Sequence, residues 1–135
     1  MTRANPTENT PASEAALERV REYFATAQRG DSEAYAAQWV YPACVYEDGQ
    51  WQALLNPAAC RESNDRYLAD LRSMGVTGGR ILELAAREAG PGAVWVDGRF
   101  SREAAAGRVI AETRASYLVV RSGDAWRVAV CVVRS

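Results

Sequence analysis

Two side chains in the first half of the sequence, Tyr23 and Glu47, have the types needed for acid–base chemistry on a carbonyl compound. The sequence contains no histidine, so a carboxylate is the common side chain left to act as a general base. Burial in an apolar cavity raises the pKa of a carboxylate, and a buried phenol can donate a hydrogen bond to a developing oxyanion. Glu47 is therefore the candidate base, and Tyr23 is the candidate oxyanion donor.

Each of these two residues also has a structural interpretation that involves no chemistry. Tyr23 lies among apolar residues at helical spacing, where a tyrosine commonly packs in the core and donates its hydroxyl to a backbone carbonyl. Glu47 precedes an Asp-Gly turn, so its side chain can equally face solvent or pair with an arginine. The turn itself accounts for Asp48. Both interpretations stay open at this point.

A third group of polar residues, Glu112, Arg114 and Ser116, alternates with smaller residues along one segment. Side chains two apart on a strand share a face, so these three point the same way. On an inward face, a buried Glu–Arg pair could orient water or hold the carbonyl or carboxylate of a ligand. On an outward face, the same pair is a cross-strand ion pair of small energetic value.

Composition argues against several other classes of function. All sixteen basic residues are arginines, and they are interleaved with seventeen acids to give a net charge of −1, whereas nucleic-acid binders carry a basic face. The three cysteines, Cys44, Cys60 and Cys131, have no CxxC spacing, so we expect no metal site. We interpret these cysteines as buried small residues in a reducing cytoplasm. The sequence also shows no cofactor motif, so we expect no cofactor. No apolar run reaches the ~18 residues of a membrane span, and no export signal is evident.

Helical patterns come first along the chain. The polar, proline-containing residues 1–12 are expected to form a flexible arm. Over residues 13–29 apolar side chains recur every three or four positions and predict a helix, with Ser13 as its N-cap and Gly30 after its end. A second helix is predicted over 31–39, because an aspartate can cap its start and a following proline prevents its continuation.

A short hairpin and a third helix follow. Residues 43–47 and 50–55 indicate two strands joined by an Asp-Gly turn. Asn56 and Pro57 begin a helix with proline in its first turn, where a missing N–H costs little. Gly75 ends this helix. Its predicted apolar stripe consists of Tyr67, Leu68, Leu71 and Met74.

After this helix the apolar period changes from 3.6 to 2, which indicates strands. Turn residues divide the remainder into strands over residues 80–88, 93–102, 108–121 and 125–134. Helices followed by strands predict an α+β fold, with three helices in the first half packed on a strongly curved antiparallel sheet. The sheet forms a cone with an interior pocket, and residues 13–135 form one domain. Aromatic residues could shape the pocket or simply fill the core; they are Tyr35, Trp39, Tyr46, Trp51, Tyr67, Trp95 and Trp126. Of these, we expect Trp39, Tyr46, Trp51 and Tyr67 to bind the ligand.

Short motifs add to this order of elements. They are EYFATAQRGD at 22–31, ACVYED at 43–48, and the strand, turn and strand at 117–120, 123–124 and 126–128. Together they resemble the nuclear transport factor 2-like superfamily, which includes ketosteroid isomerase, SnoaL-like polyketide cyclases and limonene epoxide hydrolase. These motifs are more specific for the fold than for any chemistry.

The resemblance implies roles for three positions. Tyr23 falls at the oxyanion-hole tyrosine of ketosteroid isomerase, and Glu47 falls at its proton-transferring aspartate. Ser116 falls where that enzyme keeps a protonated aspartic acid as a second donor. A serine hydroxyl donates more weakly than a carboxylic acid, which weakens the case for steroid isomerisation.

The resemblance also orients the strand that carries Ser116. The family's pocket-facing alternation continues through Ser116 and Leu118, which places Glu112 and Arg114 inside the cone with them. Limonene epoxide hydrolase uses a comparable acid–Arg–acid set in its pocket. The opposite face of the sheet would then be apolar enough for the homodimer interface that family members often use. That face carries Tyr117 and Val119.

Two functions fit these observations. One is a cofactor-independent enzyme that acts on a small hydrophobic carbonyl-type molecule by carboxylate acid–base chemistry, as an isomerase, cyclase, dehydratase or hydrolase. Its catalytic residues would be Glu47, Tyr23, Ser116 and Arg114, and its ligand-binding residues Trp39, Tyr46, Trp51, Tyr67, Glu112 and Leu118. The other is a non-catalytic small-molecule-binding or dimeric interaction protein of the same fold. In both cases we expect a cytoplasmic homodimer with a small hydrophobic ligand, and no metal, nucleic acid or membrane partner.

Overall fold

The computed structural model describes residues 9–134, and the first helix begins earlier than the sequence pattern predicts. Helix α1 spans Pro11–Arg29, and its N-cap is Thr10, whose side chain accepts a hydrogen bond from the Ser13 N–H. A threonine cap followed by proline is a favourable helix start. The predicted arm over 1–12 therefore extends too far, because residues 11 and 12 belong to α1. Residues 1–8 of this arm lie outside the described part of the chain.

The second helix is shorter than predicted, and the first strand is longer. Gly30 ends α1 in a left-handed conformation with φ 70°, and Asp31 then caps α2 (Ser32–Ala37). The chain enters strand β1 (Trp39–Glu47) two residues later. Pro42 lies inside β1, where the register with the neighbouring strand shifts, and an irregular stretch of strand tolerates proline.

The hairpin and the third helix follow the prediction closely. β2 (Gln50–Leu54) pairs antiparallel with β1. α3 (Pro57–Ser73) begins behind an Asn56 cap. The predicted apolar stripe of α3 faces the interior except at Met74, which follows the last turn and is 60% exposed.

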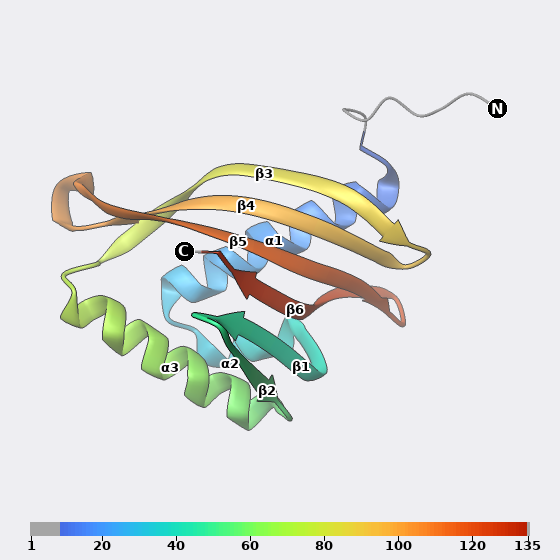
Figure 1. The fold of residues 1–135 in the computed structure, drawn as a ribbon, viewed down its shortest axis with the longest axis horizontal. Helices are drawn as coiled ribbons and strands as arrows, with labels where there is room; N and C mark the ends of the chain where they lie inside the picture. Colours follow the sequence, from blue (N-terminus) through green and yellow to red (C-terminus); the bar gives the residue numbers. More distant parts are fainter. Residues whose placement is uncertain (1–8, 135) are drawn as a thin grey trace.

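Four longer strands complete a six-stranded sheet. They are β3 (Gly78–Gly90), β4 (Ala93–Glu103), β5 (Val109–Ser122) and β6 (Ala125–Val133). The order across the sheet is β2-β1-β6-β5-β4-β3, and all neighbours are antiparallel except β1 and β6, which are parallel. The sheet is curved and does not close (Figure 1). The predicted α+β fold is confirmed, with a sheet that is mostly rather than wholly antiparallel.

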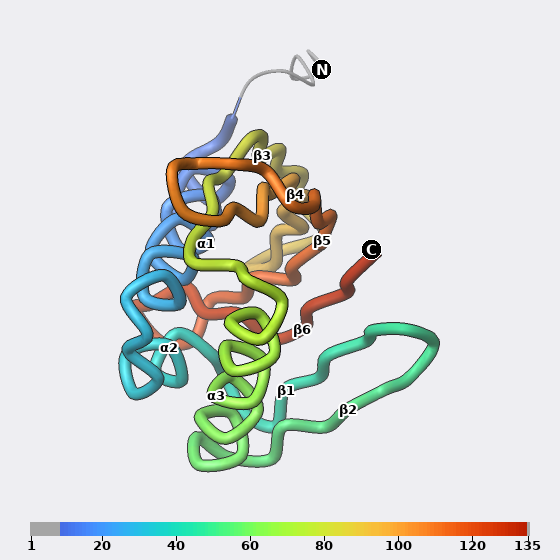
Figure 2. The backbone as a smooth tube through the Cα atoms, turned by 90° about the vertical axis from the view of Figure 1, so that its left-hand side faces the viewer, coloured from blue at the N-terminus to red at the C-terminus, as the bar shows by residue number. Residues whose placement is uncertain are grey.

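The three helices lie on one face of the sheet, which we call the inner face (Figures 1 and 2). α1 packs against β3, β4, β5 and β6, whereas α3 packs against α2 and β2. Alternate strand residues form the core with α1, and they include Val94, Val96, Phe100, Ala115, Tyr117 and Val119. No helix within residues 9–134 is both long and apolar enough to cross a membrane.

Candidate functional site

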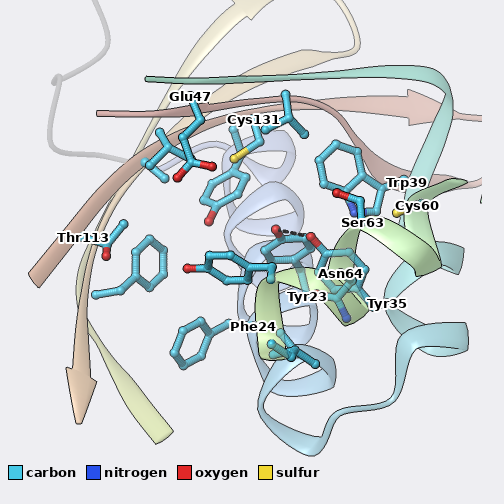
Figure 3. A pocket seen from close by; sticks show the side chains of 18 of the residues that line it. Tyr23, Phe24, Tyr35, Trp39, Glu47, Cys60, Ser63, Asn64, Thr113 and Cys131 are labelled. Carbon is cyan, nitrogen blue, oxygen red and sulfur yellow. Dashed lines mark hydrogen bonds between the residues drawn. The ribbon is translucent and has the colours of Figure 1, made fainter. Parts of the chain in front are cut away.

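A cavity of about 140 Å³ lies between the helices and the inner face of the sheet. Its walls come from all three helices and from β1, β2, β4, β5 and β6. Apolar and aromatic side chains alternate around it with polar groups, and Figure 3 shows several of these groups converging on one space. A concave, largely apolar space with a few convergent polar groups is the usual form of a small-molecule site.

Tyr23 of α1 and Tyr35 of α2 form a hydrogen-bonded pair on the cavity wall, with 2.8 Å between the hydroxyl oxygens (Figure 3). Burial raises the pKa of both phenols well above the usual value, so both stay protonated. One hydroxyl donates to the other, and the accepting hydroxyl keeps its hydrogen for a further acceptor. The pair can therefore donate a hydrogen bond to an oxygen atom of a ligand.

Aromatic rings fix the position of Tyr23. The ring centroids of Tyr117 and Trp39 lie 5.2 Å and 5.9 Å from that of Tyr23, both in edge-to-face orientation. Trp39 is 1% exposed, and its indole N–H has no hydrogen-bond partner among the described residues. A buried unpaired donor is destabilising, so this N–H is a cost that the packing of the described residues leaves uncompensated.

Glu47 lies at the end of β1 and lines the same cavity. Its side chain is exposed, so the enclosure expected of the base is not found. Figure 3 shows the carboxylate directed toward the other lining residues. Burial raises the pKa of Cys131 to about 12, and it also raises the pKa of Tyr67; the negative charge of Glu47 adds to both shifts. Glu47 therefore acts electrostatically on the cavity from its mouth.

Arg102 of β4 is a cavity residue that the sequence analysis missed. It donates a hydrogen bond from Nη2 to the Tyr67 hydroxyl, and its guanidinium carbon lies 5.5 Å from the centroid of that ring. The sequence signal for its position is the alternation along β4. Every second residue of this strand faces inward, and Val94, Val96, Gly98 and Phe100 form this series. Arg102 continues that face by one further step.

The sequence matches a family model as well as a fold. The family described as NTF2-like protein (DUF6841) matches residues 13–135. The chain belongs to this NTF2-like family. The resemblance drawn from the motifs is thereby confirmed at the level of the superfamily.

Solved structures share the fold of this NTF2-like protein. Aln2 from a Streptomyces species is 17% identical, with a TM-score of 0.73 and coverage of 93% of this chain and 91% of that chain. A cystatin-like-fold protein of unknown function from Nostoc punctiforme is 8% identical, with a TM-score of 0.74 and coverage of 94% and 93%. An NTF2-like protein from Novosphingobium aromaticivorans is 18% identical, with a TM-score of 0.70 and coverage of 89% and 79%. These similarities show the fold alone. Comparison with curated proteins gave no match.

Four predicted site residues of the NTF2-like chain lie on the other face of the sheet, which we call the outer face. They are Glu112, Arg114, Ser116 and Leu118. The cavity is lined instead by the alternate residues of β5, which are Thr113, Ala115 and Tyr117. The expected orientation of this strand is therefore wrong, because a shift of one residue turns every side chain to the opposite face of the sheet. The cause is packing, because Ala115, Tyr117 and Val119 are all buried in the core. For the same reason, Tyr117 and Val119 do not form an exposed interface.

On the outer face these polar residues bind their neighbours. Ser116 Oγ donates to Asp97 Oδ1 at 2.5 Å, and Glu112 forms an ion pair with Arg99. Arg114 lines a separate shallow depression beside them. This arrangement is the cross-strand alternative that the sequence left open.

The four predicted aromatic residues divide between the two faces. Trp39 and Tyr67 line the cavity. Tyr46 and Trp51 are cross-strand partners on the outer face, with ring centroids 4.7 Å apart, and Trp51 is 69% exposed. The prediction that these two shape the pocket is therefore wrong, because alternation along β1 directs Val45 and Glu47 inward instead.

The three cysteines are free thiols. Cys60 and Cys131 are buried and line the cavity, whereas Cys44 is half-buried on the outer face. Burial raises the pKa of Cys60 and Cys131, so both remain protonated. Among residues 9–134 no group of three or more potential metal-ligating side chains occurs.

Proposed function

We propose that the protein binds a small, largely apolar carbonyl compound in this cavity and transfers a proton at the carbon beside the carbonyl, without a cofactor. The observation that carries the proposal is that the Tyr23–Tyr35 pair and Glu47 line one cavity. The pair supplies a hydrogen-bond donor and Glu47 supplies a base. These are the two functions that enolisation of a carbonyl compound needs.

In the proposed mechanism the carbonyl oxygen accepts a hydrogen bond from the tyrosine pair. Glu47 takes a proton from the adjacent carbon, and the electron pair of that C–H bond forms the enolate, whose charge develops on the oxygen. In a ligand that carries a C=C bond between the second and third carbons from the carbonyl, the enolate is conjugated with that bond. The protonated Glu47 then returns the proton to the third carbon, the C=C bond shifts into conjugation with the carbonyl, and the carboxylate is restored. A cyclase or a dehydratase would use the same activation of a carbonyl compound.

Two features of the cavity support this chemistry. Both phenols stay protonated because burial raises their pKa, so they stabilise negative charge as donors. The surrounding rings of Trp39, Phe100 and Tyr117 lower the local polarity, and a hydrogen bond to an oxyanion is stronger in such surroundings.

The test is deuterium wash-in at the carbon beside the carbonyl, followed by NMR with small aryl and cyclic ketones as probes. Glu47→Gln should abolish exchange and leave ketone binding nearly unchanged. Tyr23→Phe should slow exchange by about 10²-fold or more, which is typical for loss of one oxyanion donor. Glu83→Gln is the matched control, because Glu83 is an exposed acid of β3 outside the cavity. Exchange at the wild-type rate in Glu47→Gln would contradict the mechanism.

The second candidate function is ligand binding without catalysis. The exposure of Glu47 favours it, because a general base gains most from a desolvated position. This function predicts that the ketones bind to the wild-type protein and that no deuterium enters them. Binding without exchange would therefore select the second function over the first.

We also propose that two copies associate through the outer face of the sheet. A band of exposed and half-exposed apolar side chains crosses this face, and the strand register places its members side by side. The band consists of Cys44, Tyr46, Trp51, Trp95, Leu118, Val130 and Val132. A second copy that presents the same band would form a twofold interface. A free thiol in this band fits the reducing cytoplasm expected from the sequence.

A further inference from the structure

Arg102 is a half-buried cation on the cavity wall that has no acidic partner within the described chain. None of the acids in residues 9–134 lies within 4.0 Å of its guanidinium nitrogens. Its contacts are the Tyr67 hydroxyl and the face of the same ring. Its Nε is buried and has no hydrogen-bond partner in the described residues.

The neighbouring charges of the sheet are arranged differently. Glu103, the next residue along β4, accepts hydrogen bonds from Arg80 and Ser101. On the outer face Arg99 lies between Glu83 and Glu112. A guanidinium that leaves water is normally paired with an acid, because desolvation of an unpaired charge is expensive. Arg19 and Arg127 are also half-buried without an acid, but they donate to oxygen atoms of the chain. Arg102 differs from them because its buried Nε has no partner in the described residues.

The charge of Arg102 also acts inside the cavity. Burial raises the pKa of Tyr117, and the positive charge of Arg102 partly opposes that rise. Tyr117 lies in edge-to-face contact with Tyr23, so the field of Arg102 reaches a residue that packs against the tyrosine pair. An anionic group placed against Arg102 would lie in the same cavity as an oxygen bound to that pair.

We propose that Arg102 binds the carboxylate of the ligand, and that the ligand is a small aryl or apolar oxo acid. Arginine binds a carboxylate through two parallel N–H donors, and the two terminal nitrogens of the Arg102 guanidinium can supply them. Arg102 is the one cation among the described residues that line the cavity. Glu47 at the mouth is negative, so the electrostatics favour a monoanion over a doubly charged phosphate. The carbonyl group of this ligand rests on the proposed function, whereas the carboxylate contact requires no turnover.

Glu47 is the alternative partner for Arg102, because both line the cavity and both act on Tyr67. The two hypotheses differ in what they predict for the wild-type protein. If Arg102 binds the carboxylate of a ligand, loss of the Glu47 charge removes a repulsion and carboxylates bind as tightly or more tightly. If Glu47 is the natural partner of Arg102, a ligand carboxylate gains nothing over a neutral group in the wild-type protein.

The experiment measures binding of benzoate and phenylacetate, and of the matched amides benzamide and phenylacetamide, by titration calorimetry. In the wild-type protein the acids should bind at least about tenfold more tightly than the amides, as expected for a hydrogen-bonded ion pair. Arg102→Gln should remove that preference. Arg114→Gln should keep it, because Arg114 lies on the outer face and serves as the matched control.

Several outcomes would overturn the inference. They are equal affinity for acid and amide in the wild-type protein, no binding of either acid, a preference that survives Arg102→Gln, or its loss in Glu47→Gln. The wild-type comparison needs no variant, so it can overturn the inference even if Arg102→Gln does not fold. Failure of the proposed function is distinguishable, because absent deuterium exchange leaves a carboxylate preference intact.

Discussion

The hydroxyl oxygens of Tyr23 and Tyr35 lie 2.8 Å apart although the two residues belong to different helices. The contact depends on the left-handed Gly30, which ends α1 and lets the Asp31-capped α2 return against it. Both tyrosines line the cavity, so this hydrogen bond has two consequences. It stabilises the contact between the two helices, and it determines which hydroxyl is left to donate to a ligand.

The first prediction concerns this hydrogen bond. Tyr23→Phe and Tyr35→Phe should each lower the free energy of unfolding by about 1–3 kcal/mol, because each leaves a buried hydroxyl without its partner. The double variant should lose less than the sum, with a coupling energy of roughly 1 kcal/mol. Urea denaturation measures all three values. Tyr46→Phe on the outer face is the control and should change little, and strict additivity would contradict the pairing.

The second prediction concerns alkaline pH. Burial raises the pKa of Tyr23, Tyr35 and Tyr117 in the folded protein, whereas unfolded tyrosines ionise near ~10. The folded state therefore binds these protons more tightly, and its stabilisation is complete below pH ~10 and is lost as pH rises further. Unfolding free energies between about pH 8 and 12 should fall above pH ~10. Tyrosinate absorbance of the folded protein should show a late-titrating group, and six tyrosines that ionise together near pH ~10 would contradict this.

The third prediction tests which face of β5 lines the cavity. Ala115→Leu adds volume on the inner face, so it should weaken binding of a neutral probe such as acetophenone by about tenfold or more. Ser116→Ala is the matched control on the adjacent outer position and should leave the affinity unchanged. Ligand-observed NMR measures both. The reverse pattern would show that the sequence-based orientation of the strand was correct.

The error at β5 shows where sequence patterns lose their predictive power. Helix caps and turns depend on neighbouring residues, so Gly30, Asp31 and Asn56 could be placed from the sequence. The face of a strand depends on a choice between two alternations. In β5 both alternations were plausible, because Ser116 is buried through its bond to Asp97 while Tyr117 is buried in the core.

The candidate site was predictable only in part for a related reason. Tyr23 and Glu47 could be found because each lies in a motif whose secondary structure is clear. Tyr35 could be named as a pocket aromatic, but its hydrogen bond to Tyr23 could not be predicted. Arg102 could not be found at all, because its importance depends on a contact between distant segments. Arg102 meets Tyr67 across 35 positions of sequence. Such contacts follow from the curvature of the sheet, which local spacing does not determine.

The last prediction concerns the outer face. Trp51 is 69% exposed and packs in a tilted orientation against Tyr46 at the end of the apolar band. If this band joins two copies, Trp51→Glu should shift the protein from dimer to monomer in sedimentation analysis, because it places a charge in an apolar interface. The fold should persist, since the side chain has little contact with the core. Met74→Glu is the matched control, because Met74 is 60% exposed but lies beyond α3, away from the band. A wild-type protein that sediments as a monomer, or a Trp51→Glu dimer, would contradict the proposed interface.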